Sequence, residues 1–174
     1  MDTTPTWDSA KHLLDEYDGA ATEIFVVGLS LRRLPAVVAA LSKLPELEVT
    51  SFEDATLESP EPFDSVWRSR FESAPSRNCQ HSLRSANGTA RHLQIYLWAD
   101  VEAATLEVEL VFWNDLTFPT NLELVEREQR LRALVSLAEA CRTGVPRARC
   151  ILAPEHNGPT EELLEGNDEH VVVW

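Results

Sequence analysis

The segment Gly28 to Arg32, GLSLR, is the part of the sequence that comes nearest to a catalytic motif. A nucleophile elbow has the pattern G-x-S-x-G, in which the second glycine allows close packing at a strained turn. Arg32 occupies that second position, so Ser30 is explained more simply as part of a strand–helix connection. A small hydrolase would require Ser30 or Cys79 to meet a histidine in the fold, and it is the least favoured functional alternative.

The histidines and cysteines do not form a recognisable metal or redox motif. None of the histidines pairs with another at the spacing of metal ligands on a helix. The three cysteines, Cys79, Cys141 and Cys150, form no C-x-x-C, which argues against a disulfide framework and a zinc site. Cys141 and Cys150 are expected to be buried, and Cys79 is the candidate reactive thiol, without an evident base. The sequence therefore predicts no catalytic residue, no cofactor and no metal.

The charge of the chain is more informative than these motifs. There are 29 acidic residues against 15 basic ones, which gives a net charge of -14. Such a charge repels nucleic acid and anionic membranes, and it speeds the encounter with basic partners. The segment 53–62 is expected to be an acidic loop, with the carboxylates Glu53, Asp54, Glu58 and Glu61. The simplest alternative is a solvated surface that keeps the protein soluble.

The segment 91–113 predicts a β-hairpin, because apolar and polar residues alternate along two arms. One face of the hairpin is apolar and is predicted to belong to the core: Leu93, Ile95, Leu97, Leu106, Val108, Leu110 and Phe112. The opposite face mixes aromatic and acidic residues with a few others: His92, Gln94, Tyr96, Trp98, Glu107, Glu109, Val111 and Trp113.

The mixed face has two interpretations. Aromatic side chains are typical anchors of protein interfaces, and carboxylates around them provide steering and specificity. A helix packed over the face would instead make the aromatic residues part of the core. On the first interpretation the predicted partner-binding residues are Tyr96, Trp98, Glu107, Glu109, Trp113 and Asp115. A second set of candidates is the acidic loop with Glu53, Asp54, Glu58 and Glu61.

The remaining elements follow from periodicity and from residues that start or stop helices. Helices are predicted over 7–18, 34–44 and 120–141, with a helical turn or two over 63–71. Thr120 and Glu123 fit a capping box at the start of the third helix. Strands are predicted over 23–29, 47–53, 147–152 and 170–174. The segments 73–89 and 153–169 are expected to be loops, the first exposed and locally basic, the second acidic.

These elements predict an α+β fold in a single domain, residues 1–174. The sheet is expected to be mixed or largely antiparallel. Its central hairpin, about 91–113, should pack against the helices 34–44 and 120–141. A strand–helix–strand unit is expected at the front of the chain, over residues 23–53.

The chain also resembles a known class of small acidic proteins, the bacterial immunity proteins that neutralise toxic effectors. The segment Val27 to Arg33, the alanine-rich helix Pro35–Leu44 and the pair Trp113–Asn114 after a strand are similar to the immunity protein 52 family. Val27 departs from that pattern, because an aromatic residue is expected there. The resemblance implies binding to a nuclease toxin delivered by type VI secretion, and it assigns no individual residue.

The expected function is therefore inhibition by binding to a basic surface of a cognate toxin, without direct contact to nucleic acid or membrane. An effector chaperone or adaptor, which binds a client without inhibiting it, is the main alternative. The N-terminal residues lack the pattern of a signal peptide, and no segment has the roughly 18 to 20 apolar residues needed to span a bilayer. A cytoplasmic location is expected, and the oligomeric state is not predicted.

Overall fold

The computed structural model describes residues 4–15, 21–85, 92–155 and 171–174. The helices are α1 (Trp7–Leu14), α2 (Leu34–Leu41), α3 (Ser65–Glu72), α4 (Asn114–Thr117) and α5 (Leu124–Arg142), with a 3-10 turn at Leu31–Arg33 before α2. The strands are β1 (Ala21–Ser30), β2 (Leu47–Phe52), β3 (Ala55–Pro62), β4 (Cys79–Ser85), β5 (Leu93–Asp100), β6 (Thr105–Trp113), β7 (Arg149–Pro154) and β8 (Val172–Val173). Parts of the predicted elements lie outside the described residues: 16–18, 86–89, Arg91 and 156–170.

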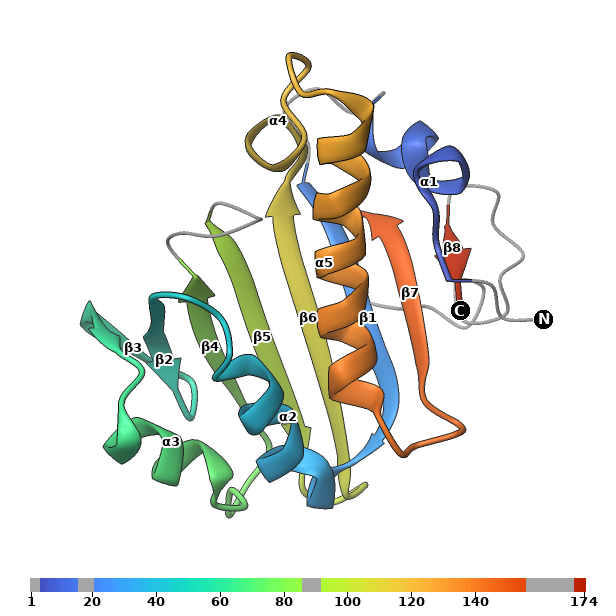
Figure 1. The fold of residues 1–174 in the computed structure, drawn as a ribbon. Helices are drawn as coiled ribbons and strands as arrows, with labels where there is room; N and C mark the ends of the chain where they lie inside the picture. Colours follow the sequence, from blue (N-terminus) through green and yellow to red (C-terminus); the bar gives the residue numbers. More distant parts are fainter. Residues whose placement is uncertain (1–3, 16–20, 86–91, 156–170) are drawn as a thin grey trace.

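The described strands form one sheet with the order β3-β2-β4-β5-β6-β1-β7-β8 (Figure 1). Each described pair of neighbouring strands is antiparallel. The predicted hairpin is the central pair β5–β6, in which Tyr96 lies opposite Glu109 and Trp98 opposite Glu107. The predicted strand–helix–strand unit corresponds to β1, α2 and β2, but β6, β5 and β4 separate its two strands in the sheet. The α+β fold class with a central hairpin is confirmed.

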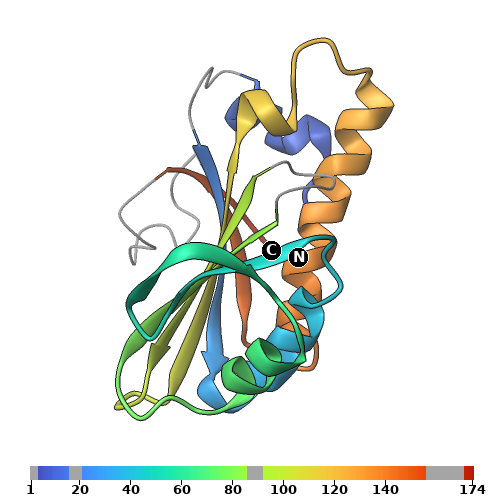
Figure 2. The ribbon, with the colours of Figure 1, turned by 90° about the vertical axis from the view of Figure 1, so that its left-hand side faces the viewer.

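The helices cover one face of this sheet, which we call the core face (Figures 1 and 2). α5 packs against β1 and α2, and its buried residues join those of the sheet in one large apolar cluster. The predicted apolar face of the hairpin belongs to this cluster, and each of its residues is at most 2% exposed. Burial of this face against α5 and α2 gives the hairpin a fixed register, because a slip by one residue would turn the apolar side chains to solvent.

The segment 53–62, which was predicted to be an acidic loop, is a tight turn followed by the edge strand β3. Glu53 and Asp54 both have positive φ angles, 48° and 67°, and they connect β2 to β3 as a two-residue hairpin turn. Glu58 and Glu61 lie on β3 beside prolines. Such residues are typical of an exposed edge strand, where they oppose pairing with another chain. The loop prediction was wrong because these residues also lower the general propensity for strands.

The segment 73–89 was predicted to be an exposed loop, but it contains β4, an interior strand of the sheet. Its polar side chains hid the alternation, because several of them are satisfied inside the fold. The Ser82 hydroxyl lies 2.7 Å from the hydroxyls of both Thr50 and Ser51. The Ser85 hydroxyl donates to the carbonyl of Pro45 (2.9 Å). Hydrogen-bonded polar groups can be buried at little cost, so composition alone misleads here.

The long helix α5 begins later than predicted. Its N-cap residue is Glu123, whose backbone N–H donates to Glu126 (3.3 Å), so the predicted cap at Thr120 was wrong. The carbonyl of Thr120 instead accepts a hydrogen bond from the Arg127 side chain (2.8 Å), within the connection to α4. The predicted helix 34–44 is α2, which ends at Leu41.

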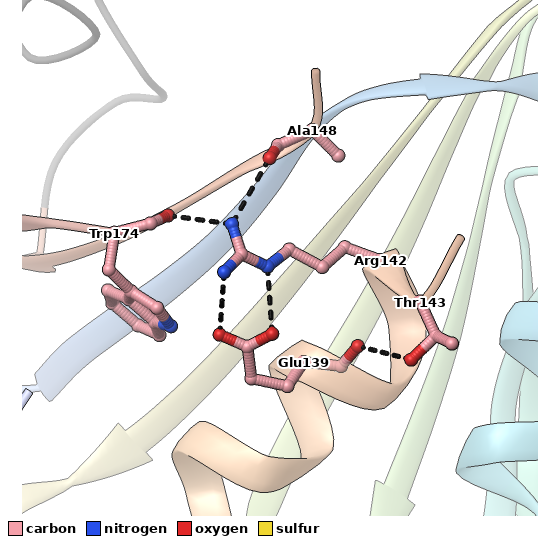
Figure 3. Close-up of polar contacts among 5 residues, drawn as sticks. All are labelled: Glu139, Arg142, Thr143, Ala148 and Trp174. Atoms are coloured by element: carbon pink, nitrogen blue, oxygen red, sulfur yellow. Dashed lines mark hydrogen bonds and ion pairs between the residues drawn. The ribbon is translucent and has the colours of Figure 1, made fainter. Parts of the chain in front are cut away.

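The other end of α5 is fastened to the edge of the sheet by Arg142 (Figure 3). Its Nε and Nη2 atoms donate to the Glu139 carboxylate at 2.9 and 2.7 Å. Its Nη1 donates to the carbonyls of Ala148 (3.2 Å) and Trp174 (3.0 Å). The buried Trp174 extends β8 by exchanging two backbone hydrogen bonds with Cys150 on β7. The predicted edge strand near the C-terminal end is thus present, and one guanidinium joins it to the helix layer.

Candidate functional site

The sheet face opposite the helices, which we call the outer face, carries the aromatic and acidic residues predicted from the hairpin. Tyr96 lies between Ser82 on β4 and Glu109 on β6. Trp98 is the next outer residue of β5, lies opposite Glu107, and is 44% exposed. None of the described helices packs on this face (Figure 2). Among the described residues, therefore, the alternative in which a helix buries these aromatic side chains does not hold.

The outer face has an apolar half over β1, β7 and β8. Phe25 and Ile151 are 0% exposed there, and Val27 and Val173 pack against them in a small second cluster. Phe25 lies opposite Glu109 in the sheet, so the change from polar to apolar occurs between β6 and β1. The half over β4, β5 and β6, which we call the polar half, contains the candidate site.

A β-bulge in β2 extends the polar half towards the sheet edge. The register shifts between Val49 and Ser51, so that Ser51 lies opposite Ser82. The extra residue turns Ser51 to the outer face and Phe52 to the core face, because side chains of a strand otherwise alternate strictly. Phe52 then stacks on the buried His81, with their ring centroids 4.6 Å apart. The bulge thus places the Ser51 hydroxyl group on the outer face, on the same side of the sheet as Ser82 and Tyr96.

The two central carboxylates of the polar half are partly buried side by side on β6. Burial, and next the neighbouring Glu109, raise the pKa of Glu107 from 4.5 to about 7. Burial also raises the pKa of Glu109, although hydrogen bonds from Trp98 and Glu23 oppose this effect. The indole Nε1 of Trp98 donates to Glu109 at 2.9 Å. None of the described residues donates a hydrogen bond to Glu107 or forms an ion pair with it.

A third carboxyl group, that of Glu23 on β1, adjoins Glu109 from the other side. Glu23 is 3% exposed and shares a hydrogen bond with Glu109. Burial and these two glutamates raise the pKa of Tyr96, whose hydroxyl donates to Gln94 (2.6 Å). At the centre of the face, burial thus raises the pKa of Tyr96, Glu107 and Glu109 alike.

Four of the predicted site residues lie away from this centre. Trp113 is on the outer face but six residues beyond Glu107 along β6, which is about 20 Å at 3.4 Å per residue. Asp115 is exposed on the short helix α4 that follows. Glu58 and Glu61 lie on the edge strand β3, where Glu61 accepts a hydrogen bond from Trp67 (2.8 Å). The structure therefore does not bring all of the predicted residues into one site.

An open cavity of about 570 Å³ does bring three of the predicted residues together, at the end of the sheet where β5 turns into β6. Asp54, Trp98 and Glu107 line it together with residues that the sequence reasoning did not select: Gly28, Asn78, Cys79, Gln80, Ala99, Asp100, Thr105 and Leu106. Asp54 reaches the cavity because its backbone and carboxylate exchange hydrogen bonds with the backbone of Gln80 (2.9 and 2.8 Å).

Gly28, on β1, lines this cavity and contributes no side chain to it. Its φ angle is +77°, and it belongs to a bulge between Val26 and Leu29. A Cβ atom at this position would lie 3.2 Å from the carbonyl oxygen of Arg147. Glycine is required by both the backbone angle and the close approach of a second segment. The glycine in a strand was visible in the sequence and was the available signal for a bulge.

Cys79 and His81 form a contact that the sequence reasoning missed, because both residues were assigned to a loop. They point to the same side of β4, with Sγ 3.7 Å from Nε2. The His81 Nδ1 accepts the backbone N–H of Glu53 (3.1 Å), so the neutral ring carries its proton on Nε2. Burial lowers the pKa of His81 and raises the pKa of Cys79. This arrangement differs from an activated cysteine, in which the imidazole accepts the thiol proton.

The other candidate nucleophile, Ser30, ends β1. Its hydroxyl accepts the backbone N–H of Arg32 (3.3 Å) and caps the 3-10 turn that follows. No described histidine forms a hydrogen bond with it. The predicted burial of Cys141 and Cys150 is confirmed, since both are 0% exposed and burial raises the pKa of each thiol to about 12.

The described residues contain no group of three or more histidine, cysteine, aspartate or glutamate side chains arranged to hold a metal ion. Among the described helices, none is long and apolar enough to cross a membrane. No family model matches the chain, and no curated protein or solved structure matches it significantly. The function must therefore be argued from the outer face itself.

Proposed function

We propose that this chain is an immunity protein, which binds and neutralises a cognate secreted nuclease toxin in the cytoplasm. The observation that carries the proposal is the polar half of the outer face. There an aromatic pair, Tyr96 and Trp98, stands among carboxylates on a sheet face that no described helix covers. Exposed tryptophan at such a position is typical of a protein interface, where a large ring supplies contact area at low entropic cost.

The partner surface should be basic. The chain carries a net charge of -14, and Asp54, Asp100 and Glu107 surround the exposed Trp98. A nuclease presents basic side chains to the phosphates of its substrate, and an acidic protein face can occupy the same groups. Inhibition would then follow from exclusion of the nucleic acid. Strong charge complementarity also speeds association, which suits a protein that must capture its target before damage occurs.

The test requires a candidate partner, namely a secreted toxin-domain protein whose gene lies beside that of this chain. Its nuclease activity is measured on plasmid DNA and on RNA with increasing amounts of this chain, and its affinity is measured by calorimetry. The proposal predicts inhibition that is complete at stoichiometric amounts and an affinity that falls with rising salt.

Variants locate the surface. Trp98→Ala and Glu107→Gln should weaken both binding and inhibition, whereas Glu58→Gln makes the same substitution on the edge strand β3 and should leave both unchanged. Full binding without any inhibition would show an adaptor or chaperone instead. Binding that survives both outer-face variants would show that the face is wrongly assigned, and absence of binding would overturn the proposal.

A further inference from the structure

The cavity beside Trp98 has properties that a flat acidic surface lacks. It has a volume of about 570 Å³, which falls in the range of about 300–1,000 Å³ that is usual for small-ligand pockets. Ala99 and Leu106 line it on the two adjacent strands, and the indole of Trp98 lies beside it on the outer face. An occupant can therefore contact the Trp98 ring and the carboxylates of the lining at the same time.

The acidic groups around the cavity are not fully neutralised by the described residues. Asp100 accepts the backbone N–H of Ala103 (2.8 Å) and forms no ion pair with a described residue. Asp54 has Arg77 at 3.7 Å, but both side chains are about half exposed, so solvent weakens this pair. Glu107 has neither a hydrogen-bond donor nor a cation among the described residues. A partly buried carboxylate without a partner is costly, and a cation placed beside it would remove that cost.

Trp98 is held in a fixed orientation at the rim. Its Nε1 donates to Glu109 (2.9 Å), and its ring lies 6.4 Å from the ring of Tyr96. The indole is nevertheless 44% exposed, so part of its π surface is open to an occupant. A tryptophan face is the best aromatic partner for a cation, and a guanidinium can stack on it.

We propose that this cavity receives one arginine side chain of the partner protein, with its guanidinium stacked on Trp98 and paired with Glu107. This inference rests on the proposed function, because it specifies the chemistry of the partner at the same site. Arginine fits better than lysine because its planar group can stack and donate two hydrogen bonds to a carboxylate at once.

The inference is tested on the whole chain with Nα-acetyl-arginine amide as the probe. Binding is followed by changes in the backbone amide signals of Asp100 and Glu107 in NMR titrations at constant ionic strength. The neutral isostere Nα-acetyl-citrulline amide is the matched control for charge, and Nα-acetyl-lysine amide is the control for shape. The expected order of affinity is arginine above lysine, with no saturable change for citrulline.

Substitutions at the cavity and on β3 distinguish a loss of arginine binding from a general loss of folding. Glu107→Gln should weaken arginine binding about fivefold or more, since an ion pair at a partly buried site is worth about 1 kcal/mol. Trp98→Phe keeps a stacking surface and should retain most of the affinity, whereas Trp98→Leu should not. Glu58→Gln, on β3, should bind like the unmodified chain.

The outcomes separate the two proposals. If the arginine probe binds no better than citrulline while the toxin still binds the outer face, the cavity inference is overturned and the proposed function stands. If the probe binds as expected but no toxin does, the arginine site stands and its assignment to an immunity function falls.

Discussion

Replacing Glu107 by glutamine should stabilise the protein at pH 8 and leave its stability nearly unchanged at pH 4. Burial raises the pKa of this carboxyl from 4.5 to about 7 in the folded state, and Glu109 adds to the effect. The folded protein therefore holds the proton of Glu107 more tightly than the unfolded chain does. The stability that comes from this difference is fully present below pH 4.5, and it is lost as the pH rises through about 7.

The size of the effect follows from the same two values. The pKa change corresponds to at most about 3.4 kcal/mol, at about 1.36 kcal/mol for each pH unit. Glu107 is partly exposed, and water screens its interactions, so we expect about 1 to 1.5 kcal/mol. Glutamine resembles the protonated acid in size and shape. It should therefore recover this free energy at pH 8, where the unmodified carboxylate is ionised.

The assay is urea unfolding of the unmodified chain and the variant at pH 4, 6 and 8, followed by tryptophan fluorescence. The groups around Glu107 are the same in both proteins: Glu109 on β6, Asp100 on β5, Asp54 in the β2–β3 turn and Cys79 on β4. Titrations of groups that do not interact with Glu107 therefore cancel in the difference, whereas the interaction of Glu107 with Glu109 is part of the measured effect. Glu58→Gln on the exposed edge should show no difference at any pH. An equal stability of the Glu107 variant and the unmodified chain at pH 8 would refute the burial of this carboxylate beside Glu109.

Three further predictions concern residues that support the sheet and helix α5 around the site. Gly28→Ala should lower the free energy of unfolding by about 1–3 kcal/mol, because the residue has φ +77° and a Cβ would lie 3.2 Å from the Arg147 carbonyl oxygen. The measurement is urea unfolding, and an unchanged midpoint would contradict that geometry. Arg142→Met should lower the free energy of unfolding by about 1–3 kcal/mol and lower the thermal midpoint, because the Glu139 carboxylate and the Trp174 carbonyl lose their shared donor. The control is Arg132→Met, at an exposed position on the same helix. All three thiols should react slowly with Ellman's reagent at pH 8 in the folded protein and quickly in urea, because Cys79, Cys141 and Cys150 are buried. Rapid reaction of a single thiol in the folded protein would show that one of them is accessible.

The central part of the fold follows from local pattern. Leu93, Ile95 and Leu97 alternate with Gln94, Tyr96 and Trp98, and this period of two predicts both the strand and its two faces. The apolar face is long enough that a single register is favoured. The sequence reasoning therefore placed Trp98 and Glu107 on one face without knowledge of the rest of the sheet.

The failures have physical reasons as well. In β4, Gln80, Ser82 and Arg84 alternate with Cys79, His81 and Leu83, but the small and polar members of both sets obscured the pattern. Their burial is permitted by cross-strand hydrogen bonds, which local composition does not reveal.

The cavity could not be predicted from local pattern either. Gly28, Asp54 and Trp98 are far apart in the sequence, and the strand order and two bulges bring them together. Strand order depends on long-range contacts, whereas periodicity reports only the faces of each strand. The alternation thus predicted which residues share a face, and the sheet topology decides which of them share a site.

The affinity of the cognate toxin for a doubly neutralised outer face tests the central claim most directly. Glu107→Gln/Glu109→Gln removes two carboxylates from the polar half, and Glu58→Gln/Glu128→Gln removes two from exposed positions on β3 and α5. Burial raises the pKa of Glu107 and Glu109, so the first variant loses no more charge than the second, and non-specific electrostatic attraction does not explain a larger effect of the first. The account predicts a loss of at least tenfold in affinity for the first variant and little change for the second. Equal affinities for the two variants would contradict it.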